Sequence, residues 1–374
     1  MSDTRDRKSP EMYIGLMSGT SLDGIDAALV GLGQRPILLG AEFVPYPKAL
    51  RTRLLALHEP ARNELEDAAR LGIELSRHYA AAVDRVLARS GVRAGKIRAI
   101  GCHGQTIRHR PEAGYTVQLG NPAWLAERTG ITVVADFRSR DIAAGGQGAP
   151  LVPAFHAACF RNRYRHRAVV NLGGIANLTG LPPKGRVTGF DTGPGNILLD
   201  AWMRERFGRD LDRGGALAAR GKLIPGLLRR MLADAYFRRR PPKSTGRDRF
   251  NLAWLRAFGV LRHKPENVQA TLAELTARSL ASAVVRFSPG TEEIYLCGGG
   301  VHNVDLIGRI ARLLPGIGIA TTESLGIHPD WVEAAAFAWL ARCALRHEPG
   351  NLATVTGAKG PRILGAIYPG IANK

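Results

Sequence analysis

The chain has 374 residues, 45% of them hydrophobic and 22% charged, which is typical of a folded protein large enough for two domains. Four cysteines lie far apart: Cys102, Cys159, Cys297 and Cys343. Their spacing argues against a disulfide framework and a zinc site. The net charge of +20 raises the question of nucleic acid, but the basic clusters at 161–167 and 238–249 match no nucleic-acid-binding motif. We interpret them as solvated surface and do not expect nucleic acid as a partner.

We predict no signal peptide at the start of the chain and no membrane-spanning segment. Residues 1–10 are charged and lack an apolar core, so we expect a flexible tail and not a signal peptide. The longest nearly apolar stretch, 334–345, is interrupted by Arg342 and is shorter than the roughly 20 residues that cross a bilayer. We therefore expect a cytoplasmic protein with no membrane segment.

Short apolar runs rich in Ile and Val alternate with segments of helical periodicity. In chain order we predict strands at 13–17 and 27–32, a helix at 67–90, strands at 97–100, 131–135, 168–171, 175–181 and 187–190, helices at 197–207, 225–237 and 267–287, a strand at 294–297, and helices at 303–314 and 330–346. This succession predicts an α/β protein.

Glycine-rich turns follow three of the predicted strands, at 17–24, 171–177 and 297–300. Glycine lets backbone N–H groups turn toward a phosphate, and Ser, Thr or Asn supply further donors. A fourth turn, 189–196, places the carboxylate of Asp191 among them. Together these turns predict a polyphosphate ligand.

The order strand, glycine turn, strand occurs at 13–32 and again at 168–181, before the later turn of Gly298, Gly299 and Gly300. This arrangement resembles the actin, hexokinase and Hsp70 superfamily of ATP-binding proteins. A P-loop and the dinucleotide fingerprint are absent. We therefore expect a two-lobed actin-like (ribonuclease H-like) ATPase fold with a central cleft. The first lobe is predicted to comprise 11–140 with 352–374, and the second 141–351.

Longer strings resemble the anhydro-N-acetylmuramic acid kinase family along nearly the whole chain. They are GLMSGTSLDG at 15–24, CHGQTIRH at 102–109, ADFRSRD at 135–141, GGQGAPLVP at 145–153, NLGGIAN at 171–177, GFDTGPGN at 189–196 and KSTGR at 243–247. The resemblance implies ATP with Mg²⁺ as cofactors, a homodimer, and two lobes that close on ATP and sugar. It also implies a reaction that hydrolyses the 1,6-anhydro bridge of the sugar and phosphorylates the freed O6 in cell-wall recycling.

Such a reaction needs a base that activates water against C1 on the face opposite O6. We assign this base to Asp191, at a strand end before a glycine turn. The alternative is a turn residue that binds the amides following it. No separate acid is evident, so we expect the departing O6 to be captured by the phosphoryl group. Asn196 is expected to be the N-cap of the next helix.

The nucleotide contacts are predicted in three groups. These are Gly19, Thr20, Ser21, Leu22, Asp23, Gly24, Ile25 and Asp26 in the first loop, Gly173, Gly174 and Asn177 in the second, and Gly298, Gly299, Gly300 and Asn303 at the adenosine end. Asp23 or Asp26 is positioned to bind the hydration shell of Mg²⁺. An ordinary hairpin turn and tight strand-to-helix packing are the structural alternatives.

The sugar contacts are expected at Ser18, His103, Arg138, Arg140 and Glu333. A guanidinium at Arg138 or Arg140 can hold the lactyl carboxylate, and the family pattern favours Arg140, with a surface arginine as the alternative. His103 either lines the sugar pocket or is an internally bonded structural residue.

Three further positions have competing interpretations. Glu333 lies three residues after Asp330, the spacing of a helix capping box, whereas the resemblance implies a sugar contact. Cys102 is rejected as a nucleophile paired with His103, because neighbours on a strand point to opposite sides. The segment 243–247 is either a basic lid or a solvated loop.

These observations predict a sugar kinase that converts 1,6-anhydro-N-acetylmuramic acid, ATP and water to N-acetylmuramic acid 6-phosphate and ADP. One alternative is a kinase of the same fold that acts on another amino sugar. The other is a non-catalytic, nucleotide-responsive protein that binds nucleic acid through its basic surface.

Overall fold

The computed structural model describes residues 10–19 and 22–371, so the predicted contacts Thr20 and Ser21 lie outside the described residues. The chain forms two compact units, Met1–Phe155 with Trp331–Lys374, and His156–Asp330. Each unit has its own sheet, as an α/β protein of two domains requires. Among the described residues, no helix is long and apolar enough to cross a membrane.

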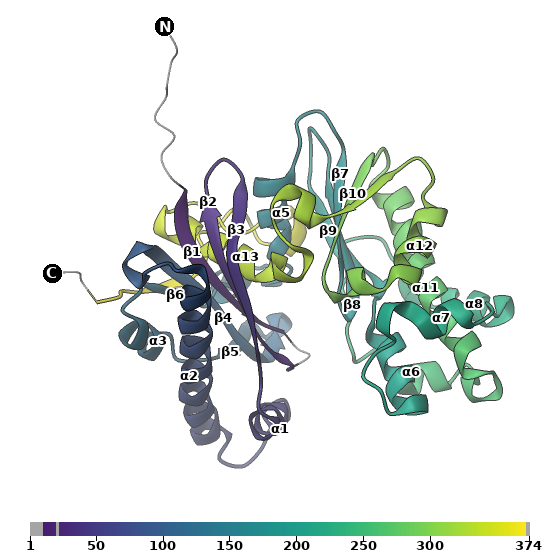
Figure 1. Ribbon diagram of the computed structural model, residues 1–374, viewed down its shortest axis with the longest axis horizontal. Coiled ribbons are helices and arrows are strands. Elements are labelled where there is room, and N and C mark those ends of the chain that lie inside the picture. Colours follow the sequence, from purple (N-terminus) through teal and green to yellow (C-terminus); the bar gives the residue numbers. More distant parts are fainter. Residues whose placement is uncertain (1–9, 20–21, 372–374) are drawn as a thin grey trace, which may run out of the picture. The chain divides into compact units, whose positions relative to one another are not determined.

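The first unit contains a mixed sheet in the order β12-β6-β4-β1-β2-β3, and β5 pairs with β4 (Figure 1). Its strands are β1 (Glu11–Ser18), β2 (Gly24–Leu32), β3 (Pro36–Pro45), β4 (Ile97–Arg110), β5 (Tyr115–Leu119), β6 (Val133–Ala135) and β12 (Ala366–Tyr368). β1 pairs antiparallel with β2 and parallel with β4, so the first glycine turn joins two hydrogen-bonded strands.

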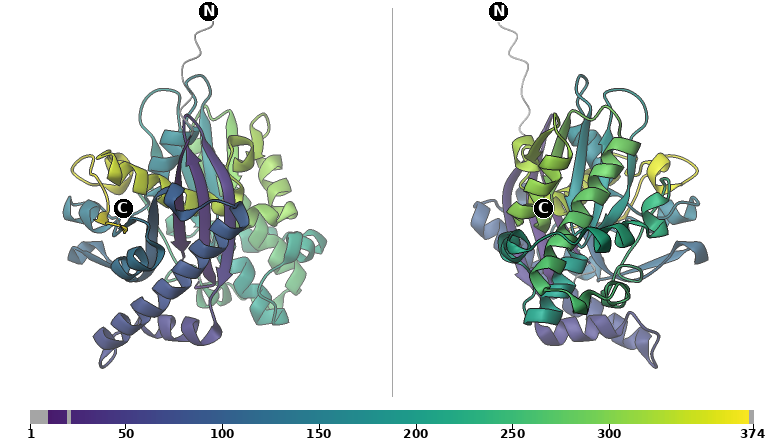
Figure 2. Two further views of the ribbon diagram at one scale, coloured as in Figure 1. Left: turned by 60° about the vertical axis from the view of Figure 1, so that its left-hand side comes forward. Right: turned by 90° about the vertical axis from the view of Figure 1, so that its right-hand side faces the viewer.

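Helices α2 (Glu64–Ser90) and α13 (Val332–Leu345) pack against β1 from opposite faces. Ile14 and Leu16 are fully buried in one apolar cluster with the inner side of α2, and Figure 2 shows α2, in blue, running across the purple strands. Gly15 lies between them and faces the other way, because side chains alternate along a strand. An added Cβ at Gly15 would lie 1.7 Å from the carbonyl oxygen of Ala334 on α13.

The compact units divide the chain at other positions than those predicted. Residues 141–155 and 331–351, expected in the second lobe, belong to the first unit. Residues 331–351 belong to the first unit because α13 lies close to β1 and β4. A second reason for the division is Asp141, which is fully buried and accepts hydrogen bonds from Gly148 N–H (2.8 Å), Asn351 Nδ2 (2.6 Å) and Thr356 Oγ1 (2.7 Å). These bonds tie segments distant in sequence into one core.

The second unit is built on the sheet β11-β10-β7-β8-β9. Its strands are β7 (Arg167–Leu172), β8 (Ile175–Leu181), β9 (Thr188–Pro194), β10 (Glu293–Cys297) and β11 (Gly318–Thr321). Helices α11 (Pro265–Phe287) and α12 (Val304–Leu313) share an apolar cluster with the strands. A second cluster surrounds the buried Trp202 and Phe250 and includes residues of α6 (Ile197–Phe207), α7 (Ala216–Arg220) and α8 (Pro225–Leu232).

All predicted strands and helices are present, with shifted ends. The predicted strand 97–100 is the start of the longer β4. The predicted helix 225–237 is interrupted, because Asp234 accepts a bond from Tyr236 N–H and begins a separate helix. The last part of that predicted helix is α9 (Ala235–Arg238). The strands and α-helices that were not predicted are β3, β5, β11, β12, α1 (Lys48–Ala56), α3 (Pro122–Thr129), α4 (Ser139–Ala143), α5 (Val152–Phe160), α7, α10 (Leu252–Arg256) and α14 (Ala353–Thr356).

Candidate functional site

The turn between β7 and β8 is tied to the start of α6. The carbonyl of Gly173 accepts a bond from Asn196 N–H (2.9 Å), and that of Gly174 accepts from Gly195 N–H (2.9 Å) and Ile197 N–H (3.0 Å). An added Cβ at Gly195 would lie 2.2 Å from the Gly173 carbonyl oxygen. The two backbones can approach this closely only because residue 195 has no side chain.

The third glycine turn packs against the end of β7 in the same unit. An added Cβ at Gly300 would lie 2.5 Å from Cβ of Leu172, and one at Gly298, whose φ is +80°, would lie 2.1 Å from Oδ1 of Asn171. Gly174 and Gly299 are themselves exposed. The second unit thus gathers two exposed glycine turns and the start of α6 at one end of β7, an arrangement suited to binding phosphate.

Two asparagines beside these turns have structural roles. Asn196 occupies the N-cap position of α6, but its side chain makes no capping bond and its Nδ2 donates to the Leu172 carbonyl (2.9 Å). The N-cap position is as predicted, but the side chain makes no capping bond, because it is turned toward the end of β7 and bonds the Leu172 carbonyl instead. Asn303 caps α12, since its Oδ1 accepts from Leu306 N–H (3.0 Å).

Asp191 lies on the edge strand β9 opposite Asn177, where the pairing of β8 and β9 shifts register. Such bulges often redirect a side chain. Its Oδ2 accepts a bond from Thr245 N–H (3.0 Å), 54 residues further on, and not from the amides that follow it. Its backbone N–H donates to the Lys243 carbonyl (3.2 Å), and its carbonyl accepts from the Tyr236 hydroxyl (2.7 Å). Asp191 is therefore held on three sides by one segment.

Burial raises the pKa of Asp191 from 3.8 to about 6, although the Thr245 N–H and the charge of Lys243 oppose the rise. A carboxylate with a pKa near neutrality is matched to general-base chemistry at physiological pH. Sequence reasoning identified Asp191 but not its partners. The only signal was the string at 243–247, which lies in this segment and was interpreted as a lid or a solvated loop.

The buried His103 and the half-buried Arg138 form a hydrogen-bonded pair in the first unit. Arg138 donates to Nε2 of His103 through Nε (3.2 Å) and Nη2 (2.9 Å), and Nη1 donates to the Gly148 carbonyl (2.7 Å). Nε2 must therefore be an acceptor, so the proton is on Nδ1, which donates to the Ser18 carbonyl (3.3 Å). Burial and the charge of Arg138 lower the pKa of His103 to about 3. His103 is a neutral imidazole in this structure.

The other predicted sugar contacts occupy different environments. Arg140 is exposed, whereas the Ser18 hydroxyl is buried, donates to the Gly104 carbonyl (3.0 Å) and contacts the Tyr79 hydroxyl (2.7 Å). The capping-box interpretation of Glu333 is wrong, because α13 has Trp331 at its N-cap and no side-chain cap. Burial raises the pKa of Glu333, and the nearby charge of Arg138 opposes that rise.

The described residues at and just after the first glycine turn include two buried apolar side chains and a closely packed glycine. Leu22 and Ile25 are buried in the core, and an added Cβ at Gly24 would lie 2.4 Å from the Val44 carbonyl oxygen. Asp23 is exposed and Asp26 is half-buried. The described residues contain no group of three or more His, Cys, Asp or Glu side chains arranged to hold a metal ion.

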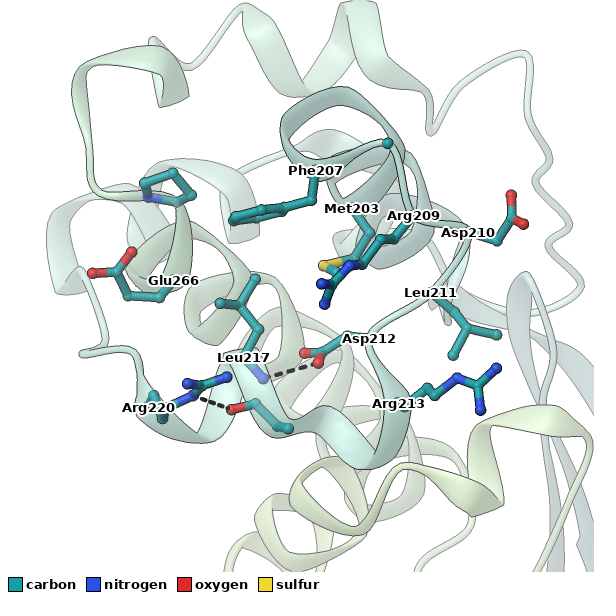
Figure 3. Close-up of a pocket in the computed structure, with 13 residues that line it drawn as sticks. Met203, Phe207, Arg209, Asp210, Leu211, Asp212, Arg213, Leu217, Arg220 and Glu266 are labelled. Atoms are coloured by element: carbon teal, nitrogen blue, oxygen red, sulfur yellow. Dashed lines mark hydrogen bonds between the residues drawn. The ribbon is translucent and has the colours of Figure 1, made fainter.

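A cavity of about 1010 Å³ lies in the second unit beside α7 (Figure 3). Asp212 lines it and accepts bonds from Leu217 N–H (2.8 Å) and Ala218 N–H (3.0 Å), which fixes the start of α7. Next to it, an added Cβ at Gly215 would lie 2.1 Å from Oδ1 of Asn303. A residue between two of the lining residues, Arg213 and Ala216, is thus in contact with Asn303, three residues after the third glycine turn.

Fold and site define an α/β protein in which exposed glycine turns and a carboxylate with a pKa raised by burial lie in the same unit. The family model described as anhydro-N-acetylmuramic acid kinase matches residues 11–370, and the chain belongs to that family. It is 56% identical over 365 residues to the anhydro-N-acetylmuramic acid kinase of Thiobacillus denitrificans, covering 96% of this chain and 97% of that protein. The enzyme of the same name from Nitrosospira multiformis is 54% identical over 360 residues, covering 96% and 98%.

Among solved structures, the activator of the 2-hydroxyisocaproyl-CoA dehydratase from Clostridium difficile with bound ADPNP is similar with a TM-score of 0.47 and 12% sequence identity. The likeness covers 90% of this chain and 96% of that one.

Proposed function

We propose that the chain is an ATP-dependent kinase that opens the 1,6-anhydro bridge of 1,6-anhydro-N-acetylmuramic acid and phosphorylates O6. The products are N-acetylmuramic acid 6-phosphate and ADP, and the role is peptidoglycan recycling in the cytoplasm. The observation that carries the proposal is Asp191, a base of raised pKa held by Thr245 in the unit that contains the glycine turns. Family membership supports the substrate.

In the proposed mechanism Asp191 takes a proton from water as the water oxygen attacks C1. The C1–O6 bond breaks, its electron pair goes to O6, and O6 forms a bond to the γ-phosphorus of ATP as ADP leaves. The proton on Asp191 balances the reaction, and the leaving oxygen needs no separate acid because the phosphoryl group captures it. The hydrogen bond from Thr245 N–H fixes the orientation of the carboxylate that accepts the proton.

The nucleotide phosphates are proposed to bind the backbone amides of residues 19–26, Gly173, Gly174 and residues 298–300. The carboxylates of Asp23 and Asp26 are oxygen donors of the kind that Mg²⁺ prefers, and with few protein ligands the ion keeps its water molecules. Mg²⁺ would neutralise charge on the phosphates. In the first unit, Arg140 is exposed and is proposed to hold the lactyl carboxylate, while Arg138 keeps His103 in place. We also propose a homodimer, which the family resemblance implies.

The cavity beside α7 is proposed to bind the nucleoside end of ATP, because Gly215, next to its lining residues, contacts Asn303.

Ala216 is exposed and lines this cavity, so the Ala216→Trp side chain is expected to occupy part of it. We expect the KM for ATP to rise about tenfold and the KM for the sugar to stay unchanged. Steady-state kinetics measure both constants. Ala219→Trp is the matched control, since Ala219 is exposed on the same helix but does not line the cavity. An unchanged KM for ATP in Ala216→Trp would show that the nucleoside does not bind in this cavity.

The charge of Lys243 is expected to influence the pH profile. It favours the ionised form of Asp191, whose pKa is about 6. Removing this charge in Lys243→Met should raise that pKa and move the acid limb of kcat to higher pH, whereas Lys243→Arg should keep the limb near the wild-type position. A pH series of kcat distinguishes this shift from a uniform loss of activity. Identical pH profiles of kcat for Lys243→Met and the wild type would contradict the prediction.

The proposed function is tested by mass spectrometry of the product formed from the sugar, magnesium-ATP and ¹⁸O-labelled water. One ¹⁸O at C1 of a phosphorylated sugar establishes hydrolysis coupled to phosphorylation. If other amino sugars are phosphorylated but this one is not, the proposed substrate is wrong. If no sugar gives ADP, the proposed kinase activity is wrong.

A further inference from the structure

A second cavity, of about 520 Å³, lies along the C-terminal half of α11 in the second unit. Four of its lining residues are cationic: Arg238, Lys243, Arg278 and Arg286. No Asp or Glu is among the lining residues. We call this cavity the α11 groove. Its size is that of a small-molecule site.

The positive charge of the α11 groove is only partly neutralised within the described residues. Arg278 forms an ion pair with Glu274 (2.8 Å). Arg238 and Arg286 are exposed, and neither forms an ion pair within the described part of the chain. Arg286 and Arg239 both act to lower the pKa of Lys243, which burial lowers most, while Asp191 opposes them. The ammonium of Lys243 therefore experiences a net excess of like charge from its arginine neighbours, which an anion would relieve.

Lys243 is held in place by aromatic rings. Its Nζ lies 4.7 Å from the ring centre of Tyr236, 5.8 Å from that of Phe190 and 5.9 Å from that of Phe287. Cation–π contacts on three sides restrict this flexible side chain. One cation of the groove is thus preorganised, which reduces the entropy lost when an anion binds.

The rest of the lining is apolar and includes Leu232, Phe237, Val285 and Leu313. Val285 is 63% exposed, so an organic ligand would cover apolar surface that now faces water. Guanidinium groups bind phosphate with paired hydrogen bonds. We propose that the α11 groove binds a small phosphate ester with several negative charges, at a site distinct from the glycine turns 17–24, 171–177 and 297–300. Thr192 of the fourth turn, 189–196, lines the groove.

The α11 groove is connected to Asp191 through the segment 236–245. Tyr236, Lys243 and Thr245 each bind Asp191, and Lys243 also lines the groove. An anion drawn to Lys243 changes both the charge near Asp191 and the position of the segment that holds it. The ligand therefore modulates turnover. This coupling rests on the proposed function, whereas binding itself does not.

The experiment uses inorganic pyrophosphate as the probe and calorimetry as the readout. The full chain is first saturated with a non-hydrolysable ATP analogue, which occupies the glycine turns. Pyrophosphate is expected to bind the wild type, and the double variant Arg238→Gln/Arg286→Gln is expected to bind it at least about tenfold more weakly. The matched control is Arg163→Gln/Arg312→Gln, which removes the same charge from exposed arginines outside the groove and should bind like the wild type.

The proposed binding site is contradicted if pyrophosphate does not bind the wild type, or if the groove variant binds it as tightly as the wild type does. It is also contradicted if the control variant loses as much affinity as the groove variant, because net charge alone would then explain the loss. A groove variant that changes the oligomeric state instead of anion affinity would show that the face is an interface between copies. The coupling is overturned if pyrophosphate binds the groove and leaves kcat unchanged. An enzyme that forms no ADP at all would contradict the proposed function and not the site.

Discussion

Asp191→Asn is expected to reduce kcat by roughly a thousandfold or more, because the amide cannot accept the proton of the attacking water. Asparagine has nearly the same shape, and its Oδ1 can still accept the Thr245 N–H that now binds Oδ2 of the aspartate (3.0 Å). The fold and the glycine turns should therefore persist. ATP affinity, measured by calorimetry, is expected to stay near the wild-type value while product formation is lost.

The matched control is Asp248→Asn, which changes an exposed carboxylate in the segment just after Thr245. It is expected to keep nearly normal turnover. The wild-type kcat should also rise as pH increases through about 6, because burial raises the pKa of Asp191 to that value and only the ionised carboxylate acts as a base. Near-normal kcat in Asp191→Asn would assign the base to another residue.

Gly15→Ala is expected to destabilise the first unit by about 3 kcal/mol or more, as overpacking against backbone does when neither element can move. The added Cβ would lie 1.7 Å from the Ala334 carbonyl oxygen and 2.7 Å from the Ala338 nitrogen. Both atoms belong to the backbone of α13, so a change of side-chain rotamer cannot relieve the clash. Chemical denaturation followed by circular dichroism measures the loss.

Gly95→Ala is the control for this prediction, because an added Cβ at that position meets nothing within 4 Å. It should change the free energy of unfolding by less than about 1 kcal/mol. A second test is Gly101→Ala on β4, where the new Cβ would lie 2.0 Å from the Phe337 carbonyl oxygen. Wild-type stability in both Gly15→Ala and Gly101→Ala would contradict the observed packing of α13.

The fold was predictable where local pattern and packing agree. The strands beside the glycine turns are apolar runs with clear ends, and every one of them is present. β3 was missed because Leu38 and Leu39 lie side by side and Gly40 interrupts the run, so no clean alternation marks a strand. The close approach of α13 to β1 depends on contacts between residues some 320 positions apart, which local periodicity does not contain.

The positions of the glycine turns and of the Asp191 carboxylate could be predicted from the sequence, but the hydrogen bonds that hold them could not. Asp191 stands out in sequence, whereas its bond to Thr245 spans 54 residues. Asp330 and Glu333 have the spacing of a capping box, yet Asp330 accepts from His302 (3.0 Å) instead of capping α13. The same spacing is compatible with either arrangement, and only tertiary contacts decide between them.

The division of the chain has a consequence for the order of folding during synthesis. The second unit is continuous, from His156 to Asp330, while the first unit needs Trp331–Lys374, including the helix that packs against β1. Domains generally fold as units when their residues have emerged. The core of the first unit, which includes the first strands to be synthesised, therefore cannot be completed until the last residues have emerged. We expect the second unit to complete its core earlier.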